Sequence, residues 1–221
     1  MQSKSKLDRI IFAERLVEAG LTLIENAKQF AHADFVRARA IRNGLMLALL
    51  TICPIRPKNF AALEIDKTFK QVRGRWWVTI SATETKSRRQ REERPIAVWL
   101  TPYINLYLDE VRPVLLTGAQ QDMNALWIST KTRGPMTKRK VGSLITQITQ
   151  ETIGIPISPH LFRTIDATTA ADARGDMPHL ARALLGHTDP SITEEHYNRA
   201  SSLSVGKDYA EILHKHYSAQ T

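Results

Sequence analysis

The forty residues from Ser158 to Tyr197, SPHLFRT…LLGHTDPSITEEHY, include His160, Arg163, His187 and Tyr197. His160 and Arg163 are three positions apart, so on a helix they share one face. His187 follows Leu-Leu-Gly, and Tyr197 comes ten positions later. Arginine and histidine side chains can hold an anion, and a tyrosine hydroxyl placed beside them can attack it. The spacing therefore predicts a phosphate-handling active site with Tyr197 as its nucleophile.

Consecutive short helices are expected to position these side chains. A capping residue and a proline open each of them, at positions 158–159, 176–178 and 189–190. Gly186 ends the second helix, HLARALL, immediately before His187. The first helix then carries the His-x-x-Arg pair, and the third carries the tyrosine.

Longer helices are expected in the rest of the chain. Apolar residues recur with helical periodicity from Leu7 to Lys28, and a second helix from Phe35 to Ile52 is apolar at its C-terminal end. Thr101-Pro102 and Thr137 are expected to cap two more helices, the second being KRKVGSLITQITQETIG. The last segment, SSLSVGKDYAEILHKHY, has the apolar spacing of an amphipathic helix.

A small amount of β-structure is expected between these helices. RWWVTISATET and PIAVWL resemble the two strands of a hairpin whose long tip, SRRQREER, is strongly basic. LWIST is expected to form a further brief strand. The sequence therefore predicts a mainly α fold with a small antiparallel β-sheet, of the α+β class.

The composition favours a protein that binds nucleic acid inside the cell. The chain has 221 residues, a net charge of +9 and a pI near 9.8, which imply a surface that attracts polyanions. No apolar run approaches the roughly 20 residues that span a membrane, and we expect a cytoplasmic protein, associated with the nucleoid if its source is bacterial. Cys53 is the only cysteine, which excludes an internal disulfide and a cysteine-based zinc cluster, and a buried position is expected for it.

The order of the chemistry-bearing residues resembles that of the tyrosine recombinase, or phage integrase, family. The chain presents an arginine after a helix, a lysine on a β-hairpin, His-x-x-Arg, a histidine in Leu-Gly-His and then a tyrosine: Arg56, Lys86, His160, Arg163, His187 and Tyr197. The likeness runs from about Phe35 to Ala200. It implies the catalytic-domain fold of that family and a site-specific recombinase acting on double-stranded DNA.

The resemblance also assigns a role to each of these residues. At pH 7 only about one tyrosine phenol in a thousand is ionised, so Tyr197 needs a base, for which His160 is the best candidate. Arg56 and Arg163 would bind the non-bridging phosphate oxygens, and His187 would donate a further hydrogen bond. Lys86 would protonate the leaving 5′-oxygen. The product is a 3′-phosphotyrosyl linkage that needs no ATP, cofactor or metal, and the sequence contains neither HExxH nor a cysteine pair.

Two positions depart from the pattern of the family. Its usual Thr-Gly-Leu-Arg-x-x-Glu reads CPIRPKN around Arg56, so the tight glycine turn and the glutamate are missing and the approach to the arginine is expected to differ. The histidine that often follows His-x-x-Arg is Thr164 here.

Basic residues outside the core motif are candidates for contacts with DNA phosphates. Arg88 and Arg89 lie in the hairpin tip, and Lys138, Arg139 and Lys140 begin a helix beside Lys131 and Arg133. Each candidate also has a structural alternative. The histidines could be hydrogen-bonded structural residues, the basic tip could be a solvated loop, and Tyr209 and Tyr217 are rival nucleophiles that lack the Leu-Gly-His lead-in.

The expected organisation is an N-terminal helical extension over 1–34, a catalytic domain over 35–200 and a C-terminal amphipathic helix over 201–221. By resemblance, that helix docks in trans and links subunits into a homotetramer on DNA; packing on its own domain is the alternative. Two other functions stay open, namely a type IB topoisomerase-like relaxing enzyme and a catalytically idle DNA-binding module. The target sequence and the biological role, whether integration, excision or dimer resolution, are not encoded in these motifs.

Overall fold

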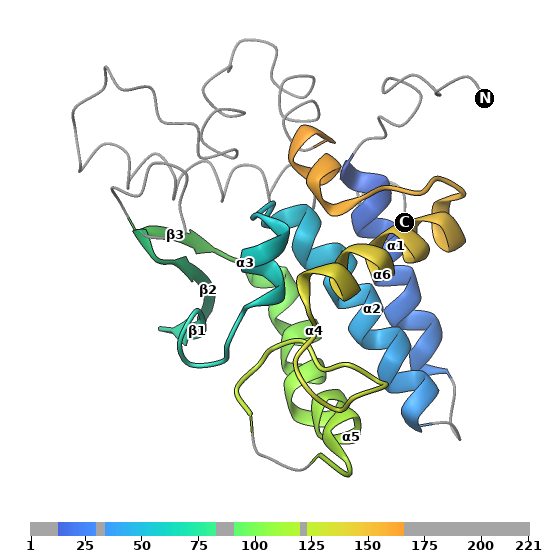
Figure 1. Ribbon diagram of the computed structural model, residues 1–221, viewed down its shortest axis with the longest axis horizontal. Coiled ribbons are helices and arrows are strands. Elements are labelled where there is room, and N and C mark those ends of the chain that lie inside the picture. Colours follow the sequence, from blue (N-terminus) through green and yellow to red (C-terminus); the bar gives the residue numbers. More distant parts are fainter. Residues whose placement is uncertain (1–12, 30–33, 83–90, 120–122, 166–221) are drawn as a thin grey trace.

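The computed structural model describes residues 13–29, 34–82, 91–119 and 123–165. Two long antiparallel helices, α1 (Ala13–Lys28) and α2 (Asp34–Ile52), pack along their lengths (Figure 1). They approach closely because a glycine from each helix meets the other: a Cβ at Gly44 would lie 2.4 Å from the carbonyl oxygen of Gly20. The second half of α2 is buried on all sides, which explains the uniformly apolar sequence there.

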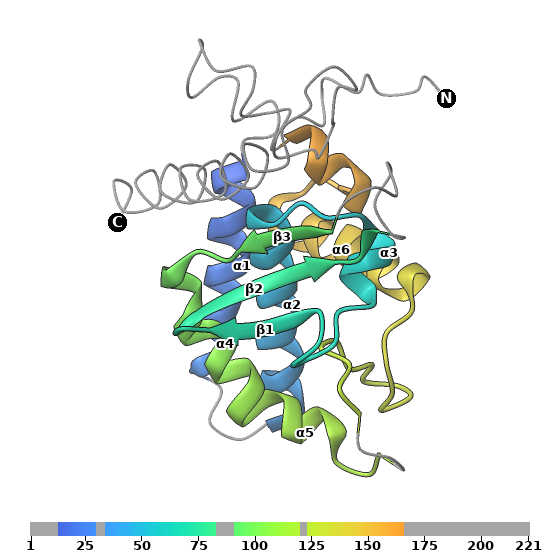
Figure 2. The same ribbon diagram turned by 90° about the vertical axis from the view of Figure 1, so that its left-hand side faces the viewer.

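A three-stranded antiparallel sheet in the order β1-β2-β3 covers one side of this helical layer. Figure 2 looks onto the sheet, with α1 and α2 behind it. Its strands are β1 (Phe69–Val72), β2 (Arg75–Ile80) and β3 (Glu92–Pro95). Phe69 and Trp76 stack with ring centroids 4.9 Å apart and anchor the β1–β2 hairpin in the core.

The remaining helices complete the core. A short helix α3 (Pro57–Ala61) follows α2, and a 3₁₀ turn η3 (Val98–Leu100) leads into a continuous helical stretch made of α4 (Thr101–Leu106), a π-helical turn η4 (Tyr107–Val111) and α5 (Arg112–Leu116). α6 (Lys138–Ile153) crosses α2 and contacts α3. No helix within these described ranges is long and apolar enough to cross a membrane.

Side chains, together with isolated backbone bridges such as Glu64 with Ala125, hold the irregular segment 123–128 in place. The Tyr107 hydroxyl donates to the carbonyl of Leu126 at 2.6 Å, and Arg42 Nη1 donates to the carbonyl of Ile128 at 2.8 Å. Arg112 binds the carbonyls of Met123 and Ala125. Burial raises the pKa of the Tyr107 phenol and lowers the pKa of Arg42 to about 10.

The mainly α fold with a small antiparallel sheet is confirmed, and so are the helices that end at Lys28 and Ile52. Residues 7–12, the expected beginning of the first of these helices, lie outside the described ranges. Thr137 caps α6 by accepting a hydrogen bond from the amide of Lys140. Cys53 is buried, as expected.

Three expectations about local structure were wrong. The second hairpin strand is Glu92–Pro95, whereas the apolar run after it forms η3, because Ile96 and Leu100 are buried with the spacing of a helix and not of a strand. Within LWIST only Ile128 makes a bridge, an isolated one with Pro135. Thr101 is the first residue of α4 and makes no side-chain cap, because η3 runs directly into that helix.

Candidate active site

Arg56 lies in a tight loop between α2 and α3. The amide of Ile55 donates to the carbonyl of Cys53 at 2.7 Å, which turns the chain at Pro54. Arg56 is extended, with φ −60° and ψ 141°, and occupies the N-cap position of α3 without a side-chain cap. Ile55 is buried and Arg56 is half-buried, so the loop is anchored in the core next to Arg56.

His160 and Arg163 lie on a helical segment, residues 159–165, that follows α6. Gly154 ends α6 in the left-handed conformation, and the chain then returns with the Ile157 amide bound to Thr149 Oγ1 at 2.8 Å. Phe162 and Ile165 are buried on the inner face of this segment, while His160 is exposed. The sequence prediction that Ser158-Pro159 opens the His-x-x-Arg helix is confirmed.

One hydrogen bond joins these two parts of the candidate site. Arg163 Nη1 donates to the backbone carbonyl of Pro54 at 2.9 Å, across 109 positions of the sequence. Arg56 follows Pro54 by two residues, which is at most about 7 Å of chain. The structure therefore brings the two predicted arginines, with His160 one turn away, to one region of the surface.

Ser158 was not among the residues singled out from the sequence, yet it contacts the predicted base. Its Oγ lies 3.0 Å from Nδ1 of His160, which leaves Nε2 as the ring nitrogen directed elsewhere. The backbone carbonyl of Ser158 also accepts from the amide of Leu161 at 2.9 Å and begins the helix. The signal available in the sequence was a serine at the helix start, two positions before the histidine.

β2 and β3 lie on either side of residues 83–90 in the sequence. Lys86, Arg88 and Arg89 belong to that stretch and lie outside the described residues. β2 ends and β3 begins on the side of the sheet nearer to α3, which carries Arg56 at its start (Figure 2). The neighbouring charges are paired: Arg91 with Glu93 at 3.2 Å, and Arg94 with Glu92. The C-terminal end of the expected basic tip therefore belongs to β3, where basic side chains form ion pairs with acidic ones.

The N-terminus of α6 presents the other predicted DNA-contacting residues. Lys138, Arg139 and Lys140 are exposed in its first turn, where the helix dipole also favours an anion. Arg133 is engaged in packing instead, with its guanidinium 4.3 Å from the centre of the Phe35 ring. Arg133 therefore packs on an aromatic ring and is not part of the exposed basic cluster at this helix start.

His187, Tyr197, the helices expected around them and the C-terminal amphipathic segment with Tyr209 and Tyr217 lie outside the described residues. The roles of these residues, like those of Arg56, Lys86, His160 and Arg163, remain predictions from the sequence.

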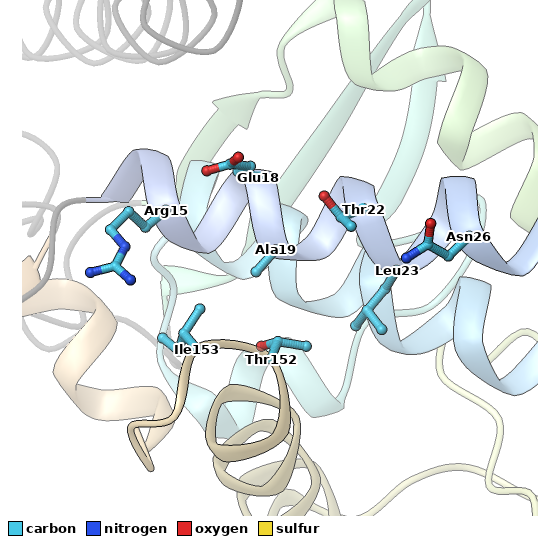
Figure 3. Close-up of a pocket in the computed structure, with 8 residues that line it drawn as sticks. All are labelled: Arg15, Glu18, Ala19, Thr22, Leu23, Asn26, Thr152 and Ile153. Atoms are coloured by element: carbon cyan, nitrogen blue, oxygen red, sulfur yellow. The ribbon is translucent and has the colours of Figure 1, made fainter. Parts of the chain in front are cut away.

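A pocket of about 400 Å³ lies elsewhere, between α1 and the C-terminal end of α6. Ala19 and Leu23 of α1 face Thr152 and Ile153 across it, and polar side chains of α1 surround its mouth (Figure 3). Of the predicted active-site residues that the structure describes, Arg56, His160 and Arg163, none lines this pocket.

The model of the phage integrase family matches residues 21–203. Among solved structures the chain is similar to a crystal structure of XerA recombinase, with a TM-score of 0.52 and 15% sequence identity. The match covers 100% of this chain and 65% of the other, and at this identity it shows a common fold. No curated protein sequence matches the chain.

Proposed function

The chain belongs to the phage integrase family of tyrosine recombinases, and from this premise we propose that it cuts and rejoins specific DNA sites through a 3′-phosphotyrosyl intermediate on Tyr197. The observation that carries the proposal is the hydrogen bond from Arg163 to the carbonyl of Pro54. It joins the two arginine-bearing motifs, which the sequence separates by more than a hundred positions. An anion-binding site made from both arginines needs such a junction.

Arg56 and Arg163 would bind the scissile phosphate. A guanidinium presents a planar fork of donors that matches two phosphate oxygens, and it stays charged at every physiological pH. The five-coordinate transition state gains negative charge on the non-bridging oxygens, so donors already in place stabilise it more than the ground state. His187 would add a donor to the same oxygens.

His160 would accept the proton of the attacking phenol. Proton acceptance at Nε2 requires the hydrogen of the neutral ring to sit on Nδ1, and that nitrogen then donates to Ser158 Oγ. In that tautomer the serine oxygen is the hydrogen-bond acceptor. Exposure of His160 leaves its ring open to a substrate on the surface.

Tyr197 and Lys86 complete the step. The phenolic oxygen forms a bond to phosphorus, the bond to the 5′-oxygen breaks, and Lys86 donates the proton that the departing hydroxyl takes up. A 5′-hydroxyl of another strand can reverse the attack and join a new partner. The energy of the phosphodiester is kept in the protein linkage, so ATP is not consumed.

The partner would be double-stranded DNA held along the basic α6 terminus and the hairpin. Four copies would assemble on two sites, with residues 201–221 of each copy docking on its neighbour, and 35–200 acting as the catalytic domain. The chain covers 65% of the XerA recombinase structure, so the division of labour in the whole assembly is part of the proposal.

A trapped covalent complex tests this function. Nicked duplexes of randomised sequence, incubated with the protein, should yield a denaturant-resistant adduct with the wild type and none with Tyr197→Phe. Relaxation of a supercoiled plasmid that carries no selected site would instead indicate the topoisomerase-like enzyme. Tight binding without any adduct would indicate the idle DNA-binding module.

A further inference from the structure

Prolines bracket the loop that carries Arg56, and each restricts it in a different way. Pro57 is the first residue of α3, where its missing amide hydrogen is not needed. Its ring disfavours the helical conformation for the preceding residue, and Arg56 has an extended backbone, with φ −60° and ψ 141°. The carbonyl of Arg56 accepts from the amide of Phe60 at 2.9 Å and begins the helix.

Pro54 fixes the other side of the loop. It is the central residue of the three-residue turn closed by the Ile55 amide and the Cys53 carbonyl at 2.7 Å, and the fixed φ of proline suits an inverse γ-turn. Its own carbonyl is the acceptor for Arg163. Cys53 is 3% exposed and Ile55 is 1% exposed, so the turn is also anchored in the core.

We propose that Pro54 and Pro57 are positioning residues that hold Arg56 ready for a phosphate before DNA binds, an inference that rests on the proposed function. The sequence CPIRPKN lacks the glycine turn usual in the family, and the two prolines supply a rigid turn in its place. A rigid loop loses little conformational entropy when its arginine is fixed on the substrate. The prolines act through Arg56 and need not touch the DNA.

The variant Pro54→Ala/Pro57→Ala tests this, because alanine keeps the carbonyl that Arg163 binds and is tolerated at the first turn of α3. The rate of adduct formation on a selected nicked duplex should fall by about four- to thirtyfold, the effect of freeing two proline-restricted positions. The same pair of substitutions in an Arg56→Ala background should have no further effect. Such a double-mutant cycle separates positioning of Arg56 from general damage to the structure.

Pro102→Ala/Pro113→Ala is the matched control, since both prolines are exposed; Pro102 lies in the first turn of α4, and Pro113 lies in the first turn of α5, directly after the π-helical turn η4. In both views these helices lie away from residues 159–165 (Figures 1 and 2). The control should leave the rate of adduct formation unchanged while altering thermal stability to a similar degree.

Other results would overturn the inference. An equal loss of rate with and without the Arg56 side chain, or a loss no larger than in the control, would show that the prolines do not act through Arg56. If the wild type forms no adduct, the proposed function fails by itself. The prolines are then tested by the affinity for the same duplex. Substituting both prolines should lower this affinity when Arg56 is present and leave it unchanged in the Arg56→Ala background. An affinity that the proline substitutions do not lower when Arg56 is present would contradict the inference.

Discussion

Arg163 donates a hydrogen bond to the backbone carbonyl of Pro54, and this bond ties the His-x-x-Arg helix to the loop that carries Arg56. The acceptor is a main-chain group, so its presence does not depend on which side chain occupies position 54. The arginine therefore has a structural contact and a proposed chemical role in the same place.

Replacing Arg163 should separate these two roles. Arg163→Ala removes a charged donor from a half-buried carbonyl, and the free energy of unfolding should fall by about 1.5 kcal/mol in urea titrations. Adduct formation should slow by roughly a hundred- to a thousandfold, the usual effect of losing one preorganised donor. Arg163→Lys keeps the charge but loses the fork, so it should recover part of the stability and little of the rate. An alanine variant with normal stability and normal rate would show that neither role exists.

The close approach of α1 and α2 makes their glycines sensitive to substitution. A Cβ at Gly20 would lie 2.7 Å from the carbonyl oxygen of Gly44, and the reciprocal distance is 2.4 Å. Because backbone atoms cannot move aside like flexible side chains, Gly20→Ala and Gly44→Ala should each destabilise the protein by roughly 1–3 kcal/mol in thermal or urea unfolding.

Gly142→Ala is the matched control for this prediction. It lies inside α6 with no atom within 4 Å of an added Cβ, so alanine should stabilise the protein by about 0.5–1 kcal/mol. Tolerance of alanine at Gly44 would mean that the two helices are further apart than described.

Tyr107 should make stability depend on pH in the alkaline range. Burial raises the pKa of its phenol above the ordinary value, so in the folded protein the group stays protonated where the unfolded chain ionises. Its contribution is complete below about pH 10 and is lost as pH rises toward the folded pKa. In Tyr107→Phe, unfolding free energy measured between pH 9 and 11 should decline less steeply, by up to about 1.4 kcal/mol per pH unit. Equal slopes for the two proteins would contradict the burial of this hydroxyl.

The first turn of α6 should contribute to DNA affinity through phosphates. In Lys138→Gln/Lys140→Gln the slope of log affinity against log salt should become shallower by about two, because each phosphate contact contributes about 0.9. Lys28→Gln/Lys67→Gln removes the same net charge from lysines that pair with Glu25 and Glu64, and its slope should stay close to that of the wild type. Equal changes in the two double variants would mean that α6 holds no phosphate.

The helices could be predicted because their signals are local. The Thr137 cap and the glycine at position 154 bound α6, and apolar periodicity outlines α1 and α2. The strand β1 carries little such signal: it exists because Arg73 and Gly74, both with positive φ, form a two-residue turn that pairs it with β2. Asparagine or aspartate before glycine marks this turn more often than arginine does.

The site could be predicted as a set of residues but not as an arrangement. Residue types and their order single out Arg56, His160 and Arg163 as candidates, since chemistry limits which side chains can serve a phosphate. The contact between Arg163 and Pro54 spans 109 positions, and it involves a carbonyl that no residue type specifies. Contacts of this kind arise from packing of the whole core and leave no local pattern.

Identifying the amino acid that carries the DNA tests the central claim most directly. The trapped adduct would be digested with a protease and a nuclease, and the nucleotide-bearing peptide would be sequenced by mass spectrometry. The account predicts a phosphotyrosyl nucleotide on Tyr197. A nucleotide on Tyr209 or Tyr217, or an adduct that persists in Tyr197→Phe, would contradict it.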